Sequence, residues 1–195
     1  MPGEEDELTD AALLARSAAG DRAAFDVVVT RHAASVLRLI RFRVAVPAEA
    51  EDVLQQTFLA AWRAASGFRG EAQVKTWLFT IARNTAAKAR DRAQRSPVAD
   101  VPIDALGVEA GWGSEDPETM ALAAERRDLL RAAFDTLDDE AREVLTCRDL
   151  EGLSGEETAA LLGVSVAAMK SRLHRARMTL AARVRGEVRR ATRGA

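Results

Sequence analysis

The sequence is poor in the residues that mark several large classes of protein. It has one cysteine in 195 residues, which excludes a disulfide framework or a cysteine-rich zinc module and fits a reducing compartment. No run approaches the ~18 apolar residues of a membrane helix, and the acidic N-terminus, MPGEEDELTD, is unlike a signal peptide. Tyrosine is absent, and five prolines are too few for a turn-rich all-β chain. A cytoplasmic protein with no membrane insertion is therefore expected.

What the chain contains in quantity is alanine and helical periodicity. Alanine supplies 40 of the 195 residues, and 48% of the residues are hydrophobic, which is too many for a highly charged disordered chain. The length suits one ordinary domain or two small ones. Neither strand-like alternation nor an internal repeat is visible in the sequence. We therefore predict an all-α fold.

Charge is segregated along the chain, although the net charge is only −2. Residues 63–95 carry 8 basic and 2 acidic side chains, and residues 166–195 carry 9 and 1. Residues 96–119, between these blocks, carry 6 acidic side chains and no basic one. Two positive blocks separated by acidic sequence indicate two separate surfaces that face anions such as nucleic acid.

The acidic segment 96–119 has the composition of a linker. It holds three of the five prolines and three of the twelve glycines, and it has no helical period. This composition predicts a flexible linker between two small helical domains, residues 1–95 and residues 120–195. Trp112 lies between two glycines of this linker and is expected either to dock on one domain or to be exposed.

Capping and breaking residues place the helices of both domains. In the first domain they predict helices over residues 11–18, from Asp21 through Ile40, from Pro47 through Trp62, and from Val74 to about Arg95. In the second domain they predict helices over residues 120–134, 139–150 and 154–162, and a last helix that starts after Ser165 and continues to about Arg190.

The end of the second domain has the pattern of a helix-turn-helix. Ser154 and Glu157 form a capping box at the start of a short helix, and Gly163 supplies the turn before a basic helix. Four apolar residues share one side of the basic helix: Met169, Leu173, Ala176 and Leu180. Polar residues gather on another side: Lys170, Ser171, His174, Arg175 and Arg177.

Such a helix can enter a major groove, with its first turns at base edges and its arginines at phosphates. The alternative is an amphipathic helix whose basic side is only solvated. His174 is expected to be a polar contact on the DNA-facing side, because neither His32 nor Cys147 stands at a metal-ligand spacing from it. We therefore expect no metal site.

The first positive block combines a glycine-flanked loop with a basic helix. In the loop, residues 66–73, glycines flank Phe68 and Arg69, and such a loop can accept an unstacked base. One side of the next helix carries three basic residues and an aromatic one: Lys75, Phe79, Arg83 and Arg90. This combination suits single-stranded nucleic acid; the alternative is that Phe79 packs beneath the linker. Trp77 is expected in the core.

The helix before this loop is acidic and amide-rich at one end, before it becomes apolar. Its polar residues are Glu49, Glu51, Asp52, Gln55 and Gln56, and its large apolar residues are Phe58, Leu59 and Trp62. Such a patch beside DNA-facing elements suggests a protein partner. The residues alone favour the alternative, an ordinary solvated face.

Three segments resemble the group 4, or extracytoplasmic function (ECF), sigma factors of bacterial RNA polymerase, which belong to the sigma-70 family. The segments are AEDVLQQTFLAAW at 50–62, FRGEAQVKTWLFTIARNTAAKARDR at 68–92 and LSGEETAALLGVSVAAMKSRLHRAR at 153–177. Their order and spacing agree with that family over nearly the whole chain except the linker and the tail. The resemblance implies a region 2 domain in residues 1–95 and a region 4 helix-turn-helix domain in residues 120–195.

The resemblance also implies partners and residue roles. Core RNA polymerase, through its β′ and β subunits, would be bound by Asp52, Gln55, Gln56 and Phe58. The −10 promoter DNA would be bound and melted by Phe68, Arg69, Lys75, Phe79, Arg83, Asn84 and Lys88. The −35 promoter DNA would be bound by Lys170, Ser171, His174, Arg175 and Arg177. An anti-sigma factor would control the protein, and no cofactor, metal or catalytic residue is implied.

The chain departs from the family pattern at two places. Gln56 stands where the family often has an acidic residue, and this change is expected to soften the polymerase contact. Ala167 and Ala168 replace the small polar or glycine residues common at the start of the reading helix, so −35 discrimination is expected to lean on DNA shape.

Two other interpretations compete with this resemblance. A two-domain DNA-binding regulator that is not a polymerase subunit would need only the helix-turn-helix, and residues 52–62 and 68–90 would then have no explanation. An enzyme is disfavoured because the sequence has no glycine-rich phosphate loop, no Ser/His/Asp set and no metal-ligand spacing.

Overall fold

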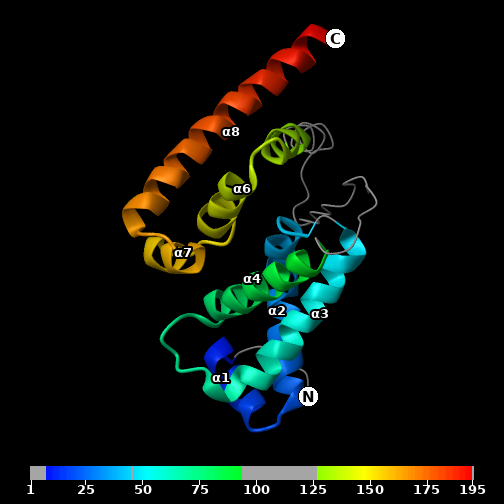
Figure 1. Ribbon diagram of the computed structural model, residues 1–195, viewed down its shortest axis with the longest axis vertical. Coiled ribbons are helices and arrows are strands. Elements are labelled where there is room, and N and C mark those ends of the chain that lie inside the picture. The colour runs from blue at the N-terminus through cyan, green and yellow to red at the C-terminus, as the bar shows by residue number, and fades with distance from the viewer. Residues whose placement is uncertain (1–7, 45, 94–126, 195) are drawn as a thin grey trace. The chain divides into compact units, whose positions relative to one another are not determined.

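The computed structural model describes residues 8–44, 46–93 and 127–194 (Figure 1). These residues form helices joined by turns and contain no strand, which confirms the all-α prediction. The chain divides into two compact units, Met1–Ile103 and Asp104–Ala195. The expected linker, residues 96–119, and Trp112 within it lie outside the described residues, so the domain boundaries stay predictions.

The described part of the first unit contains α1 (Asp10–Ala18), α2 (Arg22–Arg41), α3 (Pro47–Ala64), a 3₁₀ turn η1 (Ala65–Gly67) and α4 (Val74–Ala93). Local sequence sets where these helices begin. The Thr9 hydroxyl accepts a hydrogen bond from the N–H of Ala12, and the Asp21 carboxylate accepts one from the N–H of Ala24. Pro47 stands in the first turn of α3, where its missing N–H is not needed. These starts confirm the positions expected from the sequence.

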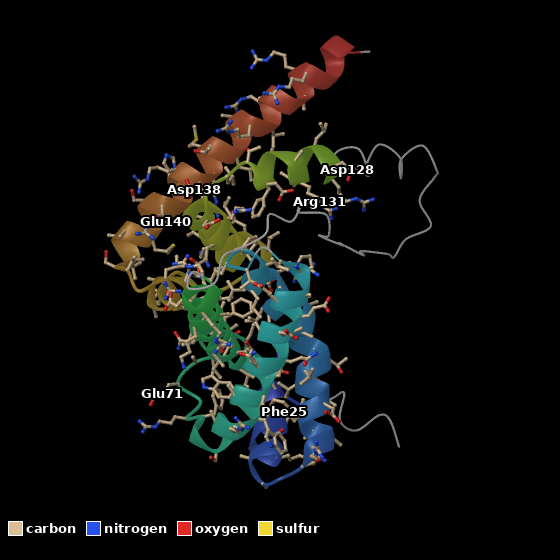
Figure 2. All side chains as sticks on the ribbon, turned by 45° about the vertical axis from the view of Figure 1, so that its right-hand side comes forward. Phe25, Glu71, Asp128, Arg131, Asp138 and Glu140 are labelled. Carbon is tan, nitrogen blue, oxygen red and sulfur yellow. The ribbon has the colours of Figure 1, made fainter. Side chains whose placement is uncertain are left out.

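The core of the first unit lies among its four helices, where α2, α3 and α4 pack on one another and α1 packs on α2. Its large, fully buried aliphatic side chains are Leu13, Leu14, Val28, Val36, Leu39, Ile40 and Leu78. An aromatic cluster joins α2 to α3 around Phe25, which Figure 2 labels. The Phe25 ring makes edge contacts with Phe58 and Trp62, at centroid distances of 6.4 and 5.1 Å.

Polar contacts also tie α1 to α2. The Asp10 carboxylate lies 2.9 Å from Nη1 of Arg31 and 2.7 Å from Nε2 of His32, and Arg31 also donates to the Leu8 carbonyl. Burial alone would raise the pKa of Asp10, but the hydrogen bond from Arg31 and the neighbouring His32 outweigh burial and lower it. The ionised carboxylate therefore stabilises the docking of α1 on α2.

The described part of the second unit contains α6 (Asp139–Leu145), a π-helical turn η2 (Thr146–Leu150), α7 (Gly155–Leu162) and α8 (Val166–Gly194), and residues 127–135 are also helical. The single helix expected over residues 139–150 changes its winding at Thr146. The N–H of Glu151 bonds to the Thr146 carbonyl, five residues back, at 2.8 Å. The unit's core is lined by Leu137, Val144, Leu145, Ala159, Leu162, Met169, Leu173 and Ala176.

α7 and α8 form the expected helix-turn-helix. The Ser154 hydroxyl accepts from the N–H of Glu157 at 3.1 Å, and the Glu157 carboxylate accepts from the N–H of Ser154 at 2.8 Å, so the capping box is confirmed. The turn lies at Gly163, whose φ of 68° is a left-handed conformation that glycine adopts without strain. Gly155 lets α7 approach α8 closely, because a Cβ there would lie 3.3 Å from Cε of Met169.

Candidate nucleic-acid interfaces

The first turns of α8 present polar side chains away from the core of the second unit. Met169, Leu173 and Ala176 are buried, which confirms the apolar side expected for this helix. The five predicted −35 contacts are all exposed: Lys170, Ser171, His174, Arg175 and Arg177. At about 100° per residue, the first four share the half of the helix that faces away from the buried residues. This half offers hydrogen-bond donors for base edges and positive charge for phosphates.

Arg177 differs from the other four residues because an acidic side chain holds it. Its Nε and Nη2 donate to the Asp149 carboxylate of η2 at 3.0 and 2.5 Å. These hydrogen bonds and the charge of Asp149 raise the pKa of Arg177. A phosphate bound at Arg177 would therefore compete with Asp149. Asp149 was not expected here, because 28 residues separate the two partners and no local pattern links them.

The start of α8 is fixed by a cap and an ion pair. The Ser165 hydroxyl accepts a hydrogen bond from the N–H of Ala168 at 3.2 Å, and Ala167 and Ala168 are exposed. Arg172 lies 3.3 Å from the carboxylate of Glu140 on α6, which Figure 2 labels. The side of α8 that carries Arg172 therefore faces α6, and the residues predicted to contact −35 DNA lie on a different side.

In the first unit, the loop between η1 and α4 holds Phe68 against α4. The rings of Phe68 and Trp77 make an edge contact at a centroid distance of 5.4 Å, and both side chains are half-buried. Trp77 thus lies at the margin of the core in which it was expected. Arg69 is exposed, and its guanidinium lies 4.0 Å from Glu71, a pairing that contributes little between exposed side chains. Arg69 is accessible to a ligand, whereas Phe68 would have to leave Trp77 to stack on a base.

Phe79 does not lie at the surface of α4. Its side chain is fully buried, so the expectation that it stacks on single-stranded nucleic acid is wrong for this structure. The buried side of α4 is wide, because Leu78, Ala82 and Ala86 are also fully buried, and Phe79 lies within about 100° of each of them around the helix. Lys75 Nζ lies 5.9 Å from the centroid of the Phe79 ring. The segment proposed to cover Phe79 lies outside the described residues.

The other residues predicted to contact −10 DNA do not share one side of α4. Asn84 and Lys88 are exposed and one turn apart, so they lie on the same face. Lys75 and Arg83 are half-buried and lie on other sides of the helix. The accessible part of this predicted site is therefore Arg69 in the loop and the Asn84–Lys88 face of α4.

α3 carries an exposed polar face that ends in an apolar side chain. Asp52, Gln55 and Gln56 are exposed on one face. Phe58 is buried against Phe25, so its predicted contact with a partner is wrong for this structure. Leu59 is 49% exposed and lies one turn beyond the two glutamines on the same face. The spacing from Asp52, at i, i+3, i+4 and i+7, is the signal that selects Leu59 instead of Phe58.

Comparison with known proteins bears on both units. Residues 28–96 match the family described as Sigma-70 region 2, and residues 127–180 match Sigma-70, region 4. The ECF RNA polymerase sigma-E factors of Salmonella typhimurium LT2 and Escherichia coli K12 are each 35% identical to this chain over 190 residues, which cover 95% of this chain and 99% of theirs. The chain belongs to the ECF sigma factors of the sigma-70 family.

Two solved structures resemble this sigma factor in fold. The structure of CnrH in complex with the cytosolic domain of CnrY is 28% identical, with a TM-score of 0.60, and the match covers 89% of this chain and 95% of that one. The co-crystal structure of the sigma factor RpoE with the anti-sigma factor NepR from Bartonella quintana is 26% identical, with a TM-score of 0.62. That match covers 83% of this chain and 96% of the other.

The two family matches cover different elements of this sigma factor. The region 2 match spans α3, the loop after it and α4, and the region 4 match spans the helix-turn-helix. Within the described residues, no three His, Cys, Asp or Glu side chains are grouped so that they could hold a metal ion. None of the helices described combines the length and the apolar character needed to cross a bilayer.

Proposed function

We propose that this sigma factor binds core RNA polymerase, directs it to promoters with −10 and −35 elements, and promotes melting of the DNA. It acts by binding and performs no chemistry of its own. The observation that carries this proposal is the exposed row of Lys170, Ser171, His174 and Arg175, presented by a capped helix-turn-helix in a chain of this family. In this role the protein works in the cytoplasm with the polymerase.

Reading of the −35 element is assigned to the first turns of α8. Lys170, Ser171, His174 and Arg175 provide donors that can reach base edges in the major groove. Arg177 is assigned to a phosphate, which would compete with the Asp149 carboxylate for the donors of its guanidinium. A phosphate would then replace or share that carboxylate partner.

Opening of the −10 element is assigned to the loop at residues 68–73 and to α4. Arg69, Asn84 and Lys88 are exposed and can hold a separated strand through its phosphates and base edges. Unstacking a base costs a few kcal/mol, so these contacts must favour the open form over the duplex. The glycine at position 70, with a φ of 72°, shapes the loop beside these residues.

Binding of core polymerase, through its β′ and β subunits, is assigned to the exposed face of α3. Asp52, Gln55 and Gln56 form its polar part, and Leu59 adds an apolar side chain at its end. Protein interfaces commonly combine apolar side chains with polar ones that surround them. We include Leu59 in this site and leave Phe58 in the core.

Control by an anti-sigma factor is the final part of the proposal. One structure similar to this chain is described as a sigma factor in complex with an anti-sigma factor, and another contains the cytosolic domain of a partner protein. Such a partner would act by covering one or more of the surfaces named above.

The proposal is tested by measuring binding to core polymerase with a matched pair of variants. Asp52→Arg places a positive charge on the proposed α3 face, and Asp26→Arg makes the same charge change at an exposed residue of another helix, α2. We expect wild type and Asp26→Arg to bind core polymerase and Asp52→Arg to bind at least about tenfold more weakly. If the wild type does not bind core polymerase, the protein is a free DNA-binding regulator instead.

A further inference from the structure

α8 is longer than a helix-turn-helix requires. It runs without a break over 29 residues, Val166–Gly194, which corresponds to about 43 Å. The region 4 match ends at residue 180, and Leu180 is also the last α8 residue that packs against the core of the second unit. None of the described side chains after Leu180 is buried. Ala181 and Val184 are half-buried, whereas the arginines at 183, 185, 189 and 190 are exposed.

These last turns carry arginines in two rows with different orientations. Arg185 and Arg189 are exposed and, with Ser171 and Arg175, fall within about 80° of one another around the helix. This row lies roughly opposite the buried residues Met169, Leu173 and Ala176. The reading side of the first turns thus continues along the helix for about 21 Å beyond Arg175. Figure 2 shows nitrogen-tipped side chains projecting from α8 well beyond its first turns.

The second row points elsewhere. Arg183 and Arg190 are also exposed, but they lie about 120° away from the first row. They share the side of Arg172, which pairs with Glu140 of α6 at 3.3 Å. Each row has two arginines and therefore the same charge. A comparison of variants in the two rows thus distinguishes an effect of position on DNA binding from an effect of charge alone.

The geometry of DNA gives the first row a partner. A major groove about 12 Å wide and 8.5 Å deep cannot contain a straight rod of about 43 Å, so α8 must leave the groove across a phosphate backbone. Residues that follow the reading residues on the same side are the ones that pass closest to this backbone. Arginine at those positions can bind phosphate oxygens without reading sequence.

We propose that Arg185 and Arg189 form a second DNA contact, a phosphate-binding stripe that continues from the −35 reading surface. The orientation of this stripe rests on the proposed −35 contact of α8. It increases the affinity of the protein for duplex DNA without changing its preference among sequences. Its partner is the duplex backbone, because the charge complementarity and the continuity with the reading row both point to DNA.

The test compares the double variants Arg185→Gln/Arg189→Gln and Arg183→Gln/Arg190→Gln in the full chain. Each removes two charges, and glutamine keeps the helical preference of arginine. Binding to a labelled 30-bp duplex of arbitrary sequence is followed by fluorescence anisotropy as the salt concentration is raised. Each lost phosphate contact lowers the slope of log affinity against log salt by about 0.9. We expect the first variant to lose about 1.8 from this slope and the second to lose less than half of that.

Three results would overturn the stripe. Equal loss of slope in both variants would mean diffuse attraction without a defined contact, and the absence of measurable wild-type binding at 25 mM salt would remove the contact altogether. An unchanged slope together with weaker binding of core polymerase by Arg185→Gln/Arg189→Gln would assign this row to a protein partner. The duplex has no promoter sequence and the assay has no polymerase. The salt dependence of binding can therefore be interpreted even if the proposed sigma-factor function is wrong.

Discussion

At the scale of single residues, Phe58 and Leu59 are chain neighbours with different environments. Phe58 is 7% exposed and contacts Phe25, whereas Leu59 is 49% exposed on the face of Asp52. We expect Phe58→Ala to lower the free energy of unfolding by about 3–5 kcal/mol because it leaves a cavity in the core. We expect Leu59→Ala to change it by less than about 0.5 kcal/mol, but to weaken core-polymerase binding about tenfold.

Urea unfolding and a core-binding titration on the same two variants measure both quantities. The comparison is internally controlled, because each variant is the control for the other. A folded, stable Phe58→Ala protein with lost polymerase binding would instead return Phe58 to the interface.

Also at the residue scale, Asp10 makes the docking of α1 depend on pH. Its pKa lies below the ordinary value of 3.8, because Arg31 and His32 stabilise the carboxylate more than burial opposes it. A depressed folded pKa gives stability that is present above the unfolded value and is lost as the pH falls through the folded value. We expect Asp10→Asn to lower the free energy of unfolding by about 1 kcal/mol at pH 7, and by progressively less below pH 3.8.

Urea unfolding of wild type and Asp10→Asn at several pH values measures this difference. Asp26→Asn, at an exposed position of α2, is the control for loss of a carboxylate elsewhere. A difference between wild type and Asp10→Asn that stays constant down to pH 2 would contradict the assigned role of the ionised carboxylate.

At the scale of elements, the loop after η1 is the part assigned to DNA opening. Phe68 packs on Trp77, so a replacement of residues 69–73 by Gly/Ser leaves that anchor in place. We expect the replaced loop to lower transcription from a duplex promoter at least about tenfold and to recover part of it on a template with mismatches at −10, because a pre-opened template needs no unstacking. Run-off transcription with reconstituted holoenzyme measures this, and an equal loss on both templates would remove the melting role from the loop.

Element boundaries followed from the sequence where the signal is local. The Asp21 and Ser154 caps, the first-turn Pro47 and the Gly163 turn are each encoded within four residues, and the structure has all of them. The π-helical turn at Thr146 was not predictable, because the same residues continue an α-helical period. Local signals therefore set where the helices begin and end, but not how each of them winds.

The accessibility of the candidate site residues was harder to predict than the helices that carry them. The sequence does not decide whether Phe79 stacks on nucleic acid or packs beneath the linker, because the buried side of α4 is completed by Ala82 and Ala86, and alanine is common on both sides of these helices. The pair of Asp149 and Arg177 depends on how η2 meets α8. Such a contact between distant segments leaves no trace in local spacing.

At the scale of the whole molecule, two units carry complementary surfaces on one chain. The first unit has an exposed polar face on α3 and accessible Arg69, Asn84 and Lys88 beside it in sequence. The second has the exposed row of Lys170, Ser171, His174 and Arg175 on α8. Neither unit alone would select a start site in the proposed function, because each contacts a different promoter element. Covalent linkage raises the effective concentration of the second contact once the first has formed.

The most direct test of this account is a map of transcription start sites made with core polymerase and genomic DNA, with and without the protein. We expect the protein to create a new set of start sites that share one −35 and one −10 sequence at a constant spacing, and we expect Arg175→Ala to relax the −35 sequence of that set. A map that is identical with and without the protein would contradict the account.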